Sequence, residues 1–312
     1  MKFLKKLFSK KIVLITHDQG YHADDVMAYA ILQEVLSRRG VNWKLIRTRN
    51  LEIQKTADIM FDTGNTYDPI KHIYDHHQAG RAGARDNGVL YASAGLIWKH
   101  FGRELCSSDE IWQAVDRYLI QELDASDNGQ NYIGNMLFPD SGYTGLGIHL
   151  VNFGPTCTEK ETPEILLQHF ENAASFARGI LSRMIHNRES LEIAFQEAKQ
   201  TYQNTSNKKI IVFDKNYDRP TWKRLAEFPE PVYAVYPKKN GEGWKVECIP
   251  INPVLMDSRK LFPESWRGLR DKELQESTNT PDAEFCHPSG FLLGTKTKET
   301  ALLLAQKSLE SY

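Results

Sequence analysis

The stretch His72-Ile73-Tyr74-Asp75-His76-His77-Gln78 places three consecutive ionisable side chains directly behind a short β-prone run. On a strand, Asp75 and His77 would share one face and His76 would lie on the other. In the turn after a strand, however, all three can converge on the carboxyl edge of a sheet, where open α/β sheets place their ligand sites. The triplet alone is a weak signal, so its interpretation depends on the chain around it.

Upstream of this stretch, other apolar runs also end in polar side chains. A strand is predicted over residues 11–16 and a helix over 26–36, and the loop between them contains His17, His22 and Asp24. Further strands are predicted over 43–48 and 57–61, the second ending at Asp62. This β-α-β-β order predicts an α/β domain with a mostly parallel, doubly wound sheet that collects polar groups at one edge.

Downstream of the triplet, residues 78–88 form a glycine-rich loop that contains two arginines, Arg81 and Arg85. Helices are predicted over 91–101 and 108–122. The second of them is expected to end in an acidic turn that contains Asp124 and Asp127.

The remainder of the chain predicts a connector and a second domain. Thr162-Pro163 opens a helical pattern that continues to about residue 203, which is long for a packed helix. After it, short strand-like runs separated by Gly and Pro predict a smaller α/β domain. We therefore expect a catalytic domain over 1–160, a helical connector over 161–204 and a substrate-binding domain over 205–312.

Composition narrows the class of protein. The 312 residues carry a formal net charge of −1, so the protein as a whole does not attract nucleic acid. Any binding of nucleic acid must come from local basic patches or from bound metal. The four cysteines form no C-x-x-C pair, which fits a reducing compartment and predicts a cytoplasmic location. No apolar run approaches the roughly 18 residues of a membrane span. The lysine-rich segment 1–11 is interpreted as a solvated stretch that leads into the first strand, in preference to a membrane-surface or targeting helix.

The polar groups at these strand and helix ends are of the types that bind metal: His17, His22, Asp24, Asp62, Asp75, His76, His77 and Asp127, with Asp124 as the alternative to Asp127. Singly, an aspartate in a turn is usually turn chemistry. Together, so many acidic groups would repel one another without a cation between them. Mixed imidazole and carboxylate ligation favours two Mn²⁺ ions, with Co²⁺, Fe²⁺ or Zn²⁺ possible and Mg²⁺ disfavoured.

Two such ions can share a bridging carboxylate and activate water, which makes hydrolysis of a phosphate ester the expected reaction. Arg81 and Arg85 are candidate contacts for phosphate oxygens. The alternative for both arginines is a solvated, glycine-rich loop.

The motif series of the chain resembles a known family. H-x-x-x-x-H-x-D from His17, D-x-G from Asp62, D-H-H from Asp75 and D-x-x-D-N-G from Asp124 are similar to the DHH phosphoesterase superfamily, and more closely to the melanocyte-proliferating-gene family of metal-dependent hydrolases. Further matching blocks lie over residues 91–96, 263–270 and 285–291. The resemblance extends from about residue 12 to residue 310.

The resemblance implies a DHH phosphoesterase domain whose site holds two metals. One metal would be bound by His17, His22 and Asp62, and the other by Asp24, Asp62, His76 and Asp127, so that Asp62 bridges them. Asp75 would orient the ligands and His77 would face the substrate phosphate, and we group Asp75, His76 and His77 as catalytic. The implied activity is 3′-to-5′ exonuclease action on single-stranded RNA or short oligonucleotides, with His287 and Lys296 helping to hold the substrate.

Two departures from the family pattern leave the substrate open. The first motif lacks the expected Asn-Gly after His17 and ends in Ala-Asp-Asp25 instead of Cys-Asp-Glu, and the last block reads Phe-Leu-Leu-Gly-Thr-Lys296 instead of Phe-Ile-Gly-Gly-Asn-Lys. One alternative is therefore a hydrolase of a small phosphate, such as a dinucleotide or pyrophosphate. Another is a non-catalytic metal-binding interaction protein. Three tryptophans near basic residues could stack on bases, but core packing is expected for at least two of them: Trp222, Trp244 and Trp266.

Overall fold

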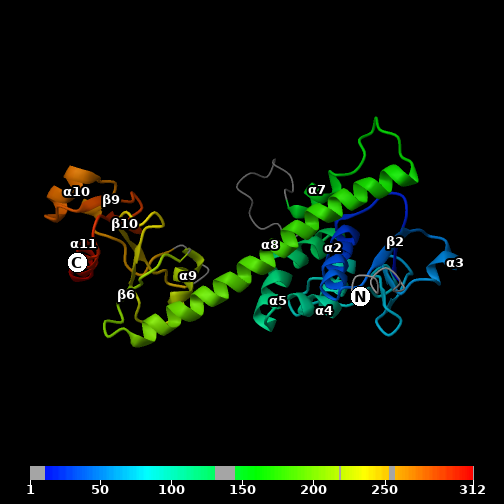
Figure 1. The fold of residues 1–312 in the computed structure, drawn as a ribbon, viewed down its shortest axis with the longest axis horizontal. Coiled ribbons are helices and arrows are strands. Elements are labelled where there is room, and N and C mark those ends of the chain that lie inside the picture. The colour runs from blue at the N-terminus through cyan, green and yellow to red at the C-terminus, as the bar shows by residue number, and fades with distance from the viewer. Residues whose placement is uncertain (1–10, 131–144, 218, 253–256, 312) are drawn as a thin grey trace, which may run out of the picture. The chain divides into compact units, whose positions relative to one another are not determined.

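The computed structural model describes residues 11–130, 145–217, 219–252 and 257–311, so most of the lysine-rich N-terminal segment lies outside the described residues. The chain divides into two compact units, one up to Glu189 and one from Ser190 (Figure 1). Each unit is built around its own five-stranded sheet.

The first sheet has the strand order β2-β1-β3-β5-β4. Its strands are short: β1 (Ile12–Thr16), β2 (Trp43–Arg47), β3 (Ile59–Phe61), β4 (Tyr67–Asp68) and β5 (Ile73–Tyr74). All pairs are parallel except β4 with β5, at the edge. The chain runs from β1 outward to β2 and then returns to β3 on the other side of β1, so the strand order reverses between β1 and β3. The predicted α/β class and mostly parallel sheet are confirmed.

Helices pack one face of this sheet. They are α2 (Ala23–Arg38), α4 (Ser93–Phe101), α5 (Asp109–Val115), α6 (Gln121–Asp127) and α7 (Leu146–Val151), and α2 lies along α4. Because side chains alternate along a strand, Leu14 and Phe61 enter the core that these helices form, while Val13 and Ile15 pack with Met60 on the opposite face. A single turn, α3 (Leu51–Gln54), capped by the side chain of Asn50, connects β2 to β3.

The predicted end of the helix over residues 108–122 is wrong. The helix expected to end at residue 122 continues through a π-helical stretch at Asp116–Ile120 and then through α6 to Asp127. The acidic and small residues of this region favour a turn locally, but the buried contacts that Asp124 makes hold the segment helical. The turn comes later, at Gly129, where φ is +66°.

The long predicted helix is present as α8 (Pro163–Asn204). Its residues contribute to both units: Phe170, Ala177 and Leu181 are buried in the first core, and Ala198 is buried in a core cluster of the second unit. It begins at Pro163, the position at which a helix best tolerates a proline.

The second unit has the strand order β6-β7-β8-β10-β9. Its elements are β6 (Ile210–Val212), α9 (Arg219–Arg224), β7 (Tyr233–Pro237), β8 (Trp244–Cys248), α10 (Asp271–Thr278), β9 (Ala283–Cys286), β10 (Leu292–Thr295) and α11 (Lys298–Glu310). Trp222 and Trp266 are buried in its core, as expected for at least two of the three tryptophans. Among the described residues, no helix combines the length and apolar character that crossing a membrane requires.

Candidate metal centre

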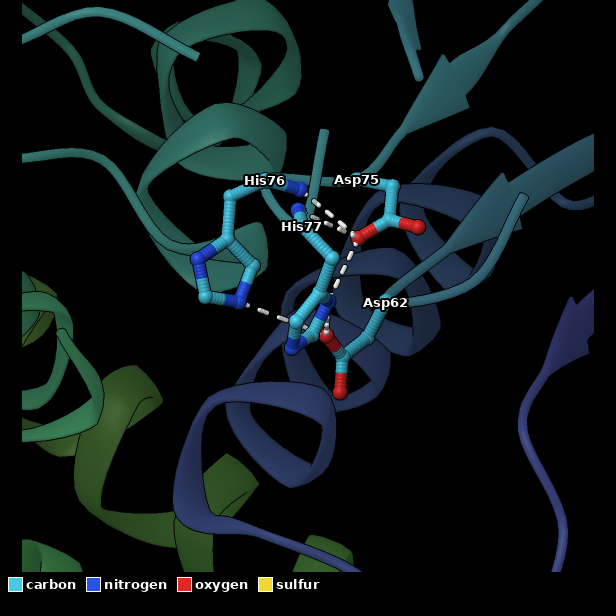
Figure 2. Close-up of side chains that lie close together, drawn as sticks. All are labelled: Asp62, Asp75, His76 and His77. Atoms are coloured by element: carbon cyan, nitrogen blue, oxygen red, sulfur yellow. Dashed lines mark hydrogen bonds and ion pairs between the residues drawn. The ribbon is translucent and has the colours of Figure 1, made fainter. Parts of the chain in front are cut away.

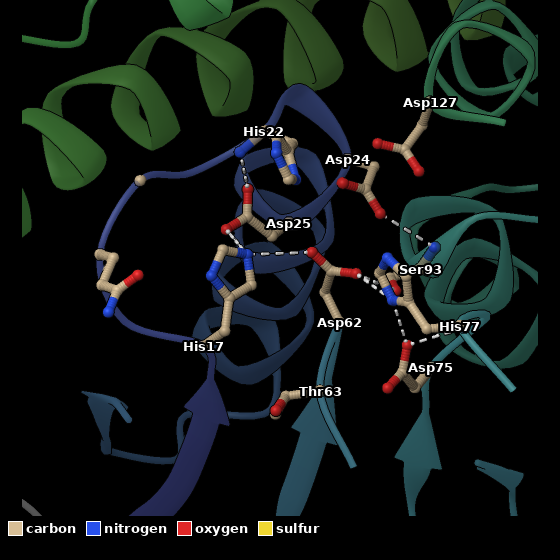
Figure 3. Close-up of polar contacts among 12 residues, drawn as sticks. His17, His22, Asp24, Asp25, Asp62, Thr63, Asp75, His77, Ser93 and Asp127 are labelled. Atoms are coloured by element: carbon tan, nitrogen blue, oxygen red, sulfur yellow. Dashed lines mark hydrogen bonds and ion pairs between the residues drawn. The ribbon is translucent and has the colours of Figure 1, made fainter. Parts of the chain in front are cut away.

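The ends of three strands and two helices meet where the strand order of the first sheet reverses (Figure 3). β1 runs into His17, β3 into Asp62 and β5 into Asp75. His22 precedes α2, whose first turn carries Asp24, and Asp127 ends α6. The fold thus brings together, in overlapping groups that could hold metal, all eight ligand-type residues predicted from the sequence: His17, His22, Asp24, Asp62, Asp75, His76, His77 and Asp127.

Asp62 lies at the centre of this cluster. Its Oδ2 is 3.2 Å from Nε2 of His17, while its Oδ1 is 3.5 Å from Nε2 of His76 and 3.5 Å from Nδ1 of His77. The carboxylate is buried, and the backbone of Asp62 has φ +49°, a region that non-glycine residues rarely occupy. Such strain persists only where the surroundings impose it, and it concentrates at functional sites. The two oxygens therefore face separate histidines, as a bridging carboxylate would.

On one side of Asp62, His17 faces the carboxylate of Asp25, with 3.3 Å between Nε2 and Oδ2. Nδ1 of His17 lies 2.9 Å from the backbone oxygen of Asp18, to which it donates. In a neutral imidazole this bond keeps the proton on Nδ1, so the lone pair of Nε2 points toward Asp25 and Asp62. This tautomer is the one that can bind a metal ion through Nε2.

Sequence reasoning missed Asp25 as a candidate ligand. An acidic residue in the first turn of a helix normally caps it, and Oδ1 of Asp25 does accept a hydrogen bond of 2.9 Å from the backbone nitrogen of His22. Its Oδ2, however, is buried and faces His17. The signal available in the sequence was that Asp25 directly follows Asp24. Capping the helix uses only one oxygen of the Asp25 carboxylate, so the other oxygen is left to act as a ligand.

On the other side of Asp62, Nε2 of His76 lies 3.1 Å from Oδ2 of Asp127 and 3.9 Å from Oδ2 of Asp24. Ser93, at the start of α4, supports this half of the cluster. Its backbone nitrogen donates to Asp24 over 3.1 Å, and its hydroxyl donates to Asp62 over 3.3 Å. Ser93 was not predicted as a site residue, although it lies in one of the motif blocks quoted above.

Asp75 organises the triplet (Figure 2). Its Oδ1 accepts hydrogen bonds from the backbone nitrogens of His76 and His77, at 2.7 and 3.1 Å, and lies 2.8 Å from Nδ1 of His77. Its Oδ2 accepts from the backbone nitrogen of Asn65 at 2.7 Å. With both oxygens engaged, Asp75 holds the backbone at His76 and His77 and orients the ring of His77.

Several buried polar atoms of the cluster lack a hydrogen-bond partner within the part of the chain that the structure describes. They are His17 Nε2, Asp24 Oδ1, Asp25 Oδ2, Asp62 Oδ2 and both ring nitrogens of His76. Buried polar atoms are normally paired, so each such atom requires an explanation. All belong to ligand-type groups, and none is sulfur. The donor set therefore fits divalent cations that accept mixed imidazole and carboxylate ligation.

The protonation of the cluster leads to the same conclusion. Burial raises the pKa of Asp24, and the neighbouring charges of Asp62 and Asp127 raise it further. For His17 and His76 burial opposes the charged form, but their carboxylate neighbours outweigh it and raise both pKa values to about 10. Without metal, these imidazoles carry protons that supply the missing positive charge.

Two cavities adjoin the cluster, each of about 470 Å³. The Arg49 cavity is lined by cluster residues and by Arg49, Leu51, Gln54, Thr63, Gly64 and Asn65. The Arg81 cavity is lined by His76, Asp127, Arg81, Ile148 and Val151, among others. His22 and His77 line both.

The two arginines predicted as phosphate contacts have different environments. Arg81 is exposed and lines the Arg81 cavity. The side chain of Arg85 is buried, and its guanidinium donates to Asp116 at 2.8 and 2.7 Å and to Asp124 at 2.7 Å. Asp124, the alternative ligand, is thus occupied by Arg85, and Asp127 is the residue that faces His76. His287 and Lys296 belong to the second unit, where Lys296 is exposed.

Comparison with known proteins identifies relatives along almost the whole chain. The family model MYG1_exonuc, described as "Uncharacterised protein family (UPF0160)", matches residues 13–309. A MYG1 protein of Schizosaccharomyces pombe is 29% identical, over 96% of this chain and 98% of its own length. A protein named MYG1 exonuclease from Mus musculus is 28% identical, over 94% of this chain and 84% of its own.

Among solved structures, RecJ of Thermus thermophilus in complex with Mn²⁺ aligns at 15% identity with a TM-score of 0.30. The alignment covers all of this chain and 54% of RecJ. The family resemblance expected from the motif blocks is confirmed by the family model.

Proposed function

We propose that this chain, which belongs to the MYG1_exonuc family, is a metal-dependent phosphodiesterase that removes nucleotides from the 3′ end of single-stranded RNA. The chain is a metal-dependent hydrolase, as the sequence predicted, and the substrate, the direction and the metal are our proposal. The observation that carries it is the placement of Asp62, whose two oxygens face separate histidines at the reversal point of a parallel sheet. The name of the mouse relative, an exonuclease, supports the choice of substrate class.

The residues that would hold metal fall on the two sides of Asp62. His17, His22 and Asp25 lie on one side, and the other side is formed by Asp24, His76 and Asp127. We propose Mn²⁺ for both positions, with Co²⁺, Fe²⁺ or Zn²⁺ as substitutes and Mg²⁺ as the more weakly bound ion. When bound, two such ions activate water and neutralise charge on the phosphate.

His77 is the group that would act on the substrate. It lines both cavities, and its side chain is 49% exposed, unlike the buried His76. The hydrogen bond to Asp75 raises the pKa of His77, which favours the form that donates a proton. In the proposed reaction water adds to phosphorus, the P–O3′ bond breaks, and the leaving O3′ takes a proton. His77 is placed to supply that proton, and Arg81 to contact the phosphate.

The proposal is tested with metal-depleted protein, Mn²⁺ and 5′-labelled single-stranded RNA. A descending ladder from wild type, absent from the Asp62→Asn variant, is the expected result. Asp109→Asn serves as the control, because Asp109 is an exposed carboxylate paired with Arg103 outside the cluster. Intact RNA with wild type would overturn the proposal for this substrate, and equal ladders from all three proteins would place the activity elsewhere.

A small phosphate is the second candidate, favoured by the net charge of −1. Hydrolysis of RNA should weaken steeply with added salt, because phosphate contacts release counterions, whereas hydrolysis of pyrophosphate should not. A non-catalytic metal-binding role predicts bound Mn²⁺ with no hydrolysis of either substrate. A cytoplasmic location stays a prediction, consistent with the four free cysteines.

A further inference from the structure

The Arg49 cavity has a side that the proposed chemistry does not use. The metal cluster contributes one wall, formed by His17, His22, Asp62, Asp75 and His77. The outer wall of the cavity is formed by Arg49, Leu51, Gln54, Thr63 and Asn65, none of which is a carboxylate or an imidazole. A volume of about 470 Å³ lies within the range of small-molecule sites.

Arg49 provides the positive charge of this outer wall. Its side chain is 56% exposed, and its Nη1 donates to the backbone oxygen of Asp18 at 2.9 Å and lies 3.2 Å from the Asp18 carboxylate. Both contacts with Asp18 are made by Nη1. Within the described residues, the other edge of the guanidinium, formed by Nε and Nη2, takes no part in them. A guanidinium held on one edge can contact phosphate with the other, and little orientational freedom is then lost.

Leu51 provides an apolar surface next to this charge. It opens α3, and its side chain is 71% exposed. The buried side chain of Gln54 is fixed within this outer wall, because its Nε2 donates to Thr48 O at 3.1 Å and to Thr63 Oγ1 at 3.0 Å. The outer wall therefore combines a cation, neutral hydrogen-bonding groups and an exposed aliphatic side chain.

We infer that the Arg49 cavity is a nucleotide subsite, in which Arg49 binds the phosphate next to the one being hydrolysed and Leu51 packs against the base. This inference rests on the proposed phosphodiesterase function. A substrate phosphate at the metal cluster would face His77, which lines this cavity and the Arg81 cavity alike. A dinucleotide spanning the cluster would then place one nucleotide in each cavity, and each cavity is lined by an exposed arginine.

The test compares three substrates, ApA, pApA and ApAp, on the Mn²⁺-loaded full chain. An added terminal phosphate that reaches Arg49 should raise kcat/KM of the wild type about 10- to 100-fold over ApA, the usual effect of a charge-assisted hydrogen bond. The Arg49→Met variant should lose most of that gain. Leu51→Asn should raise KM for all three substrates about 3- to 10-fold through lost apolar contact.

Arg103→Met is the matched control, since Arg103 is 57% exposed and also pairs with an aspartate, Asp109, on the surface. It should retain the full gain. The inference is overturned if neither terminal phosphate helps the wild type, if Arg49→Met keeps the gain, or if Arg49→Met lowers the rate on all three substrates by one common factor. The last result would mean that Arg49 acts on the metal cluster.

Failure of the proposed function is distinguishable from failure of this inference. If wild type hydrolyses no dinucleotide, binding of AMP to the Mn²⁺-loaded chain is measured by calorimetry. Binding that Arg49→Met weakens at least about 10-fold and Arg103→Met leaves intact supports the subsite without the activity. Equal binding by both variants, or none by the wild type, overturns it.

Discussion

Asp124 and Asp127 lie one helical turn apart on α6, yet they belong to opposite kinds of acidic cluster. Asp124 and Asp116 share the guanidinium of Arg85, and the second oxygen of Asp124 accepts from the backbone nitrogen of Gly95 at 2.9 Å. Asp127 faces His76 in a cluster where buried atoms of Asp24, Asp25, Asp62 and His17 have no hydrogen-bond partner within the described residues. One cluster contains a permanent cation, the guanidinium of Arg85, whereas the other contains only imidazoles, whose protons a bound metal ion would replace.

This difference separates buried charges that stabilise the fold from buried charges that serve to bind a ligand. A buried ion pair with a complete hydrogen-bond set contributes little net stability but is costly to break. A buried group of carboxylates without such a partner raises its own pKa values or binds a cation. We therefore interpret the Arg85 cluster, formed by Arg85, Asp116 and Asp124, as part of the scaffold and the Asp62 cluster as the metal site.

The largest expected effect is that of Asp62→Asn on activity. Replacing one oxygen of the group that faces both histidines should remove the shared ligand, and we expect hydrolysis to fall roughly 10³-fold, about 4 kcal/mol in transition-state free energy. Mn²⁺ content per chain, measured by atomic emission, should fall with it. Retention of both metals and of activity would show that Asp62 is not shared.

Arg85→Met should act on stability and not on metal content. It leaves the buried Asp124 and its neighbour Asp116 without their cation, and we expect a loss of about 3–5 kcal/mol in the free energy of unfolding. Urea denaturation measures this loss, and adding Asp124→Asn to the variant should recover part of it. Arg103→Met, which breaks an exposed pair, should change stability by less than about 1 kcal/mol. Unaltered stability but lost activity would instead make Arg85 a substrate contact.

Asp75→Asn should have an intermediate effect on metal binding. The asparagine keeps one acceptor for the backbone nitrogens but loses the charge that orients His77, so Mn²⁺ affinity or activity should fall about 10- to 100-fold. The pH profile of the rate should also shift, because the pKa of His77 is no longer raised by its carboxylate neighbour. An unshifted profile would contradict the assigned role of Asp75.

The last expected effect is that of pH on metal affinity. In metal-free protein the pKa values of His17 and His76 are about 10, so both imidazoles are protonated at neutral pH. Metal must displace these protons, and therefore its affinity should rise as pH increases toward these pKa values and fall as pH decreases, by about tenfold per unit for each proton released. Calorimetric titration with Mn²⁺ in buffers of different ionisation enthalpy counts the protons. Zero release at neutral pH would contradict this protonation.

The local pattern was sufficient to predict much of the fold and the cluster. Apolar runs ending in His17, Asp62 and Asp75 predict strands whose ends carry ligand-type side chains, and parallel strands bring such ends to one edge. The length of one strand was overestimated, since β3 spans only Ile59–Phe61 where residues 57–61 were predicted. The end of α6 was misplaced because turn propensity is local, whereas the contact of Asp124 with Arg85 spans 39 residues.

The sequence by itself determined which residue types stand at the ends of which elements, because hydrophobic periodicity and capping act over a few neighbours. Only the tertiary structure decided which of them share a cation. Asp124 pairs with Arg85 while Asp127 faces His76, and Asp25 reaches His17 although it also caps α2. Electrostatic pairing depends on distance in space and on burial, and neither can be read from the order of residues along the chain.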